Sequence, residues 1–238
     1  MADENAEIDN DKLLAAIKAV VNEDVTLKGN TLSDLLELKK AVYPINNAIT
    51  KELTRIFIDK LGDIFKGTPK VANAIKEIDL KNLRDYYYND QNVNSNGYDF
   101  VSFIKPEETK TSKKKKDADP PPKLDPSFPH ITAEIKANIP YEGKEYGSSQ
   151  KEGLKKDIRG LWSPDKKTKE KHDPKEDYRF LVELDCKEGE YDSGKALEAL
   201  KNTVENKDES IKLEIIDIEK PKKLEKGIIY IVKLRIEA

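Results

Sequence analysis

The chain has 238 residues, of which 37% are hydrophobic and 37% are charged, and its formal net charge is −3. The charged fraction is high against an average of roughly 25%, so we expect one core inside a large solvated surface. The slight negative charge excludes a chain coated in positive charge, and any nucleic-acid contact has to come from a local basic patch.

Residues that form disulfides, zinc sites or membrane spans are scarce. A single cysteine, Cys186, excludes a disulfide framework and a zinc site built from cysteines. The first residues are acidic, and no apolar run approaches the ~18 residues that a membrane span needs. We therefore expect a cytoplasmic protein with no signal peptide and no membrane partner.

Residues 1–90 show the period of helices, with apolar side chains recurring every three or four residues. We expect this region to be helical, to lead into the core, and to serve dimerisation or DNA recognition. The helices that the period predicts cover residues 9–21, 29–42, 44–67, 69–77 and 79–88.

Residues 91–238 alternate between strand and helix patterns and form the predicted core domain. Short apolar runs with β-branched residues predict strands, and amphipathic stretches predict helices between them. In chain order these are strands at 98–104 and 130–140, a helix at 147–162, a strand at 178–186, a helix at 193–207, and strands at 211–219 and 228–238. The polar, proline-broken segment 105–129 reads as a flexible insertion. This order favours an α/β or α+β domain with a mixed sheet flanked by helices.

The segment AEIKANIP carries the residues of greatest chemical interest. Alternate side chains of a strand share a face, so Glu134 and Lys136 point the same way while Ile135 enters the core. Asp99 lies at the start of the preceding strand, and a hairpin of the two strands brings it to Glu134. Two converging carboxylates make an oxygen-lined site that suits Mg²⁺ holding a phosphate. Lys136 beside them stabilises the charge of a pentavalent phosphate.

Asp99, followed by Glu134-Ile135-Lys136 on a later strand, resembles the PD-(D/E)XK nuclease superfamily, which includes type II restriction enzymes. The resemblance implies a restriction-endonuclease-like fold after a helical N-terminal region. It also implies that Asp99 and Glu134 bind Mg²⁺, with Mn²⁺ as a substitute, and that Lys136 is the catalytic lysine. The supporting residues that it suggests are Gln150 and Lys151 at the start of the following helix and Glu52 on a preceding one.

The resemblance further implies a site-specific endonuclease that hydrolyses double-stranded DNA as a homodimer, because cutting both strands usually needs two copies. Two lysine-rich loops, Lys113, Lys114, Lys115 and Lys116 together with Lys166 and Lys167, are candidates for contacts with the phosphate backbone.

Several alternatives remain open at this stage. Asp125 competes with Asp99 as the first acidic residue, although Pro126 and Pro129 make its surroundings poor strand material. A catalytically inactive member of the same fold would bind DNA or protein and retain the carboxylates as relics. A third possibility is an interaction protein of unrelated α/β fold, in which Asp99 and Glu134 lie far apart.

Overall fold

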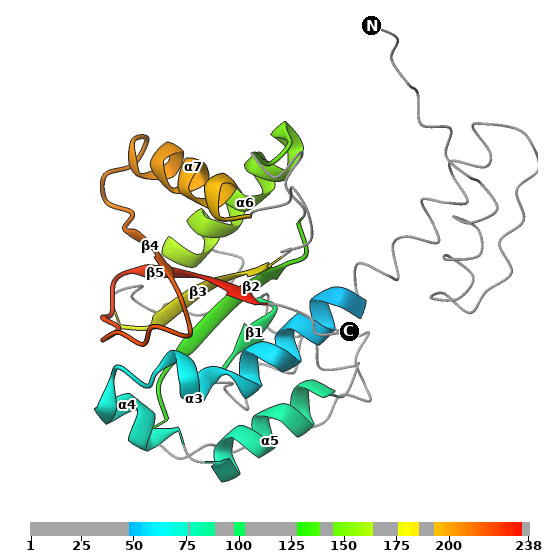
Figure 1. The fold of residues 1–238 in the computed structure, drawn as a ribbon, viewed down its shortest axis with the longest axis vertical. Helices are drawn as coiled ribbons and strands as arrows, with labels where there is room; N and C mark the ends of the chain where they lie inside the picture. The colour runs from blue at the N-terminus through cyan, green and yellow to red at the C-terminus, as the bar shows by residue number, and fades with distance from the viewer. Residues whose placement is uncertain are drawn as a thin grey trace, which may run out of the picture. The chain divides into compact units, whose positions relative to one another are not determined.

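One mixed β-sheet forms the centre of the molecule (Figure 1). It is seen in a computed structural model that describes residues 48–75, 77–88, 98–102, 128–138, 145–163, 176–185 and 193–234. The strands are β1 (Phe100–Val101), β2 (Ile131–Lys136), β3 (Tyr178–Leu184), β4 (Leu213–Ile216) and β5 (Ile229–Leu234), in the order β1-β2-β3-β5-β4. β1 pairs antiparallel with β2, and every other pair of neighbours is parallel. The expected mixed α/β architecture is thus confirmed.

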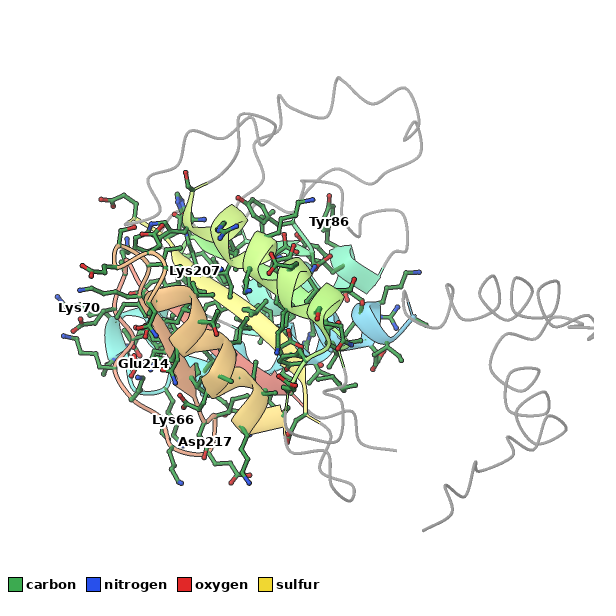
Figure 2. All side chains as sticks on the ribbon, turned by 90° about the horizontal axis from the view of Figure 1, so that it is seen from above. Lys66, Lys70, Tyr86, Lys207, Glu214 and Asp217 are labelled. Carbon is green, nitrogen blue, oxygen red and sulfur yellow. The ribbon has the colours of Figure 1, made fainter. Side chains whose placement is uncertain are left out.

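Helices cover both faces of this sheet. One face carries α6 (Ser148–Trp162) and α7 (Ser193–Glu205), which lie side by side over the strands when seen from above (Figure 2). The other face carries the helical residues 48–59, α3 (Leu61–Ile64), α4 (Pro69–Ala74) and α5 (Glu77–Tyr88). The result is a three-layer α/β/α arrangement.

β3 is buried on both faces because it lies in the middle of the sheet. Its Phe180 ring meets the rings of Phe57 at 5.4 Å and Phe65 at 5.8 Å between centroids, on the face covered by the N-terminal helices. Its Leu181 points the other way, into the apolar cluster formed with α6 and α7. Parallel strands covered by helices on both sides are near-continuously apolar, so polar residues within β3 stand out.

The predicted helix at 44–67 is interrupted in the part that the structure describes. Residues 48–59 are helical, Lys60 forms a turn, and α3 resumes with Leu61 in the core. At Gly67 the chain runs so close to the backbone of Lys222 that a Cβ atom would overlap it. Only glycine allows this approach.

Two side chains anchor β1 and thereby the residues before it. The Tyr87 hydroxyl accepts a hydrogen bond from the Val101 backbone N–H and donates one to the Val101 carbonyl, both at 2.9 Å. The Ser102 hydroxyl donates to the Pro129 carbonyl at 2.7 Å and accepts from the Ile131 N–H at 2.8 Å. Both anchors hold the C-terminal end of this two-residue strand, and Asp99 directly precedes its other end.

Residues 51–238 form one compact unit. Within the described ranges, no helix combines the length and the apolar content that crossing a membrane requires. The predicted helices at 9–21 and 29–42, and residues 105–127 of the insertion, lie outside the described residues.

Candidate active site

Asp99 directly precedes β1, and its side chain reaches the neighbouring strand β2. Its carboxylate accepts a hydrogen bond of 2.7 Å from the Ile135 backbone N–H, and the residue is buried. The antiparallel register pairs Phe100 with Ala133, which places Asp99 beside the Glu134–Lys136 segment. A carboxylate that accepts a backbone N–H on the neighbouring strand is fixed in direction as well as in position.

Lys136 gathers three carboxylates around its ammonium group, and we call these four residues the Lys136 cluster. The Nζ atom lies 2.9 Å from Glu134 Oε2, 3.4 Å from Asp99 Oδ2 and 3.4 Å from Asp157 Oδ2. The sequence predicted the convergence of Asp99, Glu134 and Lys136, and the structure brings these three together. It also adds Asp157, which sequence reasoning missed.

Asp157 belongs to α6, whose apolar stripe faces the sheet. Leu154, Ile158 and Leu161 are buried in the core, and Asp157 flanks them on the side of Lys136. The signal was present in the sequence, because Asp157 is three residues after Leu154 and four before Leu161. A carboxylate at this spacing lies at the border of the buried face.

Burial raises the pKa of Glu134 to about 8, and the nearby Asp99 and Asp157 raise it while Lys136 lowers it. Burial also raises the pKa of Asp157, again against the effect of Lys136. For Lys136, burial alone would lower the pKa, but Asp99, Glu134 and Asp157 together raise it above its ordinary value. Lys136 therefore keeps its charge at neutral pH, whereas Glu134 holds a proton until the pH approaches about 8.

Glu183 on β3 is a second acidic residue that sequence reasoning missed. The parallel register pairs it with Lys136, so both side chains lie on the face covered by α6 and α7. Glu183 is completely buried, which raises the pKa of its carboxyl well above the ordinary value. Lys136 and Asn138 lower this pKa against the effect of burial, but neither carboxyl oxygen has a hydrogen bond of full geometry. A glutamate inside the apolar run YRFLVEL was the available signal.

The predicted supporting residues make contacts of their own. Gln150 Oε1 accepts the Gly147 N–H at 3.1 Å and so caps α6. Lys151 pairs with Glu145 at 2.5 Å in an exposed position. Glu52 pairs with Arg55 at 3.0 Å on the same helix. These three contacts hold local structure, and none of them involves Lys136.

The remaining predicted positions lie outside the described residues. They are the lysines of the two loops (Lys113, Lys114, Lys115, Lys116, Lys166 and Lys167) and the rival carboxylate Asp125.

The chemistry of the Lys136 cluster suits a hard cation, but its geometry is incomplete. Its donors are carboxylate oxygens, and Mg²⁺ is commonly held by one or two carboxylates with water and substrate phosphate completing the shell. Within the described ranges, no group of three or more His, Cys, Asp or Glu side chains is arranged to hold a metal by itself. Asp99 and Glu134 thus fit a metal that also depends on water and on the substrate.

A hollow of about 650 Å³ opens beside the Lys136 cluster, and we call it the α6 cavity. Glu134 and Asp157 contribute to its wall, which links the cluster to a space large enough for a small ligand. The rest of the lining comes mainly from α6 and from the residues around it: Tyr98, Lys156, Arg159, Gly160, Trp162, Ser163, Asp208 and Ile211.

No family model matches the chain, and neither a curated protein nor a solved structure matches it. The resemblance to the PD-(D/E)XK nucleases therefore stays a prediction that rests on the residues themselves.

Proposed function

We propose that this chain is a Mg²⁺-dependent endonuclease that hydrolyses phosphodiester bonds of double-stranded DNA as a homodimer, in the manner of a type II restriction enzyme. The observation that carries the proposal is the convergence of Asp99 and Glu134 on Lys136. Three carboxyl groups crowd around one ammonium in a partly buried place, which favours a proton on Glu134, and a divalent cation would replace that proton. An arrangement that costs stability is retained most readily where it serves chemistry.

The residues of the Lys136 cluster take distinct roles in this proposal. Asp99 and Glu134 hold the metal, which when bound supplies Lewis-acid stabilisation of the scissile phosphate. Water would attack phosphorus in line and lose a proton as its oxygen forms the new bond, while the bond from phosphorus to the leaving sugar oxygen breaks and that oxygen takes up a proton from solvent. The Lys136 ammonium stabilises the negative charge that grows on the phosphate oxygens. Asp157 positions Lys136, because its carboxylate contacts Nζ from the α6 side.

The test is cleavage of duplex DNA with Mg²⁺ by the parent, Glu134→Gln and Lys136→Met. Removing one group that stabilises transition-state charge costs about 100- to 1000-fold in rate, and we expect losses of this size for both variants. Lys220→Met is a matched control, because Lys220 is exposed and forms only a local ion pair with Asp217. Equal rates in all four proteins, or no cleavage by the parent, would contradict the proposal.

A non-catalytic module that binds DNA or protein is the second candidate, and one observation favours it. Lys136 already contacts each carboxylate of the cluster, so the acidic groups are partly neutralised without a metal. Such a module shows no stabilisation on titration with Mn²⁺ or Ca²⁺, whereas a metal site raises the melting temperature.

A further inference from the structure

The residues that line the α6 cavity carry charges of both signs. On one side it begins at Glu134 and Asp157, two members of the Lys136 cluster. On the other side Lys156 and Arg159 bring positive charge from the exposed part of α6. An anionic group near Lys156 and Arg159 is attracted by these two cations, whereas the acidic residues of the same lining, Glu134, Asp157 and Asp208, repel it from the rest of the cavity.

The floor of the cavity is open because α6 carries a glycine there. Lys156, Arg159, Gly160 and Ser163 follow one another at spacings of three and four, which places them on one face of the helix. A Cβ atom built on Gly160 meets no other atom within 4 Å. The missing side chain therefore leaves open space at this position of the cavity lining.

Two aromatic residues line the same space. The Tyr98 hydroxyl donates a hydrogen bond of 3.3 Å to the Gly160 carbonyl, which holds the tyrosine against α6. Trp162 is half-buried and packs against the apolar cluster beneath α6 and α7. Aromatic faces beside cations are the combination that holds single nucleic-acid bases, through stacking on the ring and attraction of the phosphate.

We propose that the α6 cavity binds one unstacked nucleotide of the nucleic-acid substrate, with its base against Tyr98 and Trp162 and its phosphate toward Lys156 and Arg159. This inference rests on the proposed function and names its substrate class: strands in which a nucleotide at the cleavage position is unpaired or flipped out. A volume of about 650 Å³ accommodates a small ligand of this size.

The decisive variant fills the cavity from the helix backbone. Gly160→Leu places a side chain in the open space and leaves every charge of the site in place. Gly153→Leu is the matched control, because Gly153 lies on the same helix, a Cβ there also meets nothing within 4 Å, and it does not line the cavity. Both substitutions replace a helical glycine, which favours the helix in each case.

Trp162 is the only tryptophan of the chain, so its fluorescence reports on this cavity without any need for catalysis. The probe is a short single-stranded oligodeoxyadenylate, titrated with Mg²⁺ into the parent and both variants. We expect the parent and Gly153→Leu to be quenched alike, and Gly160→Leu to bind at least about tenfold more weakly, the scale of one lost stacking contact. A blunt, perfectly paired duplex should bind about tenfold more weakly than the single strand, because unstacking a base costs free energy.

Fluorescence and cleavage together separate the two proposals. Equal binding by Gly160→Leu and the parent, equal affinity for single strand and duplex, or no quenching at all would overturn the cavity proposal. Cleavage of a perfect duplex as fast as of the same duplex with an unpaired nucleotide would overturn it too, while leaving the nuclease in place. Quenching without cleavage of any substrate would instead refute the nuclease and retain the nucleotide site.

Discussion

Two clusters of charged residues lie on the same face of the sheet, and they differ in how their charges balance. Near the start of β3, the buried Arg179 pairs with the buried Asp177 at 3.1 Å and donates a second hydrogen bond to the Leu161 carbonyl. Farther along the sheet, Lys136 meets three carboxylates, with Glu183 next to it in the register. In the first cluster a single acid, Asp177, lies against Arg179 and against His130 at 3.5 Å, while in the second cluster one lysine lies against three acids.

The difference indicates which cluster serves the fold and which serves chemistry. A balanced buried pair positions secondary structure, and here Arg179 ties β3 to the end of α6. A buried cluster with more carboxyl groups than cations raises the pKa values of those carboxyls. Their ionisation destabilises the folded chain unless a further cation binds.

Arg179→Met should be the most destabilising of these substitutions. It leaves Asp177 as a buried charge without its partner, which typically costs about 3–5 kcal/mol in the free energy of unfolding. Urea denaturation measures the loss. Arg84→Met is the control, because Arg84 pairs with Asp59 at 3.1 Å in a partly exposed place and should cost less than about 1 kcal/mol. Similar losses in the free energy of unfolding of the two variants would contradict the claim that the buried pair matters more for stability than the surface pair.

Glu134→Gln should make the chain more stable above pH 8. The pKa of Glu134 is about 8 in the folded chain, against an ordinary value of 4.5 when the chain is unfolded, so the folded chain holds an additional proton between these values. Its free energy of unfolding therefore falls as the pH rises through this window. Glutamine cannot ionise, and the variant should exceed the parent by on the order of 3 kcal/mol above pH 8 and by little near about pH 4.

Urea denaturation at several pH values, without divalent ions, measures the effect of Glu134→Gln. Glu152→Gln is the control, because Glu152 is exposed and its hydrogen bond to Lys155 lowers its pKa. The control should show no gain in stability at high pH. A constant difference between Glu134→Gln and the parent across the pH range would contradict the raised pKa.

Mg²⁺ should stabilise the parent but not Glu134→Gln. Binding to the folded state alone adds about 2.7 kcal/mol at a concentration one hundred times the dissociation constant. Thermal unfolding with and without Mg²⁺ gives this difference, and the exposed Glu219→Gln should respond like the parent. An equal response in Glu134→Gln would mean that the ion binds elsewhere.

Glu183→Gln should have the smallest effect. Burial raises the pKa of Glu183 well above its ordinary value and so favours the neutral acid, which a neutral amide of similar shape replaces in the variant. We expect the free energy of unfolding to change by less than about 1 kcal/mol in urea denaturation, the range of a substitution that leaves no charge unpaired. A loss as large as that of Arg179→Met would instead identify Glu183 as a charged partner of Lys136.

The sequence was sufficient for the order of elements and for the core of the Lys136 cluster. Alternation within AEIKANIP placed Glu134 and Lys136 on one face, and the pairing of the first two strands brought in Asp99. Both inferences depend on local periodicity and on one hairpin-like pairing. They needed no knowledge of how distant elements pack.

Asp157, Glu183 and the α6 cavity depend on packing between elements that are distant in sequence. The contact of Asp157 with Lys136 requires the rotation and height of α6 over the sheet, which the buried Leu154 and Ile158 determine together with α7. The position of Glu183 next to Lys136 requires the parallel register of β2 and β3. Periodicity within one segment carries neither kind of information.

The place of β5 in the sheet has a consequence for biosynthesis. β5 is the last strand in the chain, yet it lies between β3 and β4 and pairs with both. While the chain emerges from the ribosome, β3 keeps one unpaired edge until residues 229–234 have been made. An apolar strand with an open edge is a template for pairing with other chains, so the nascent protein is exposed to aggregation at β3 until β5 has been made and has paired with it.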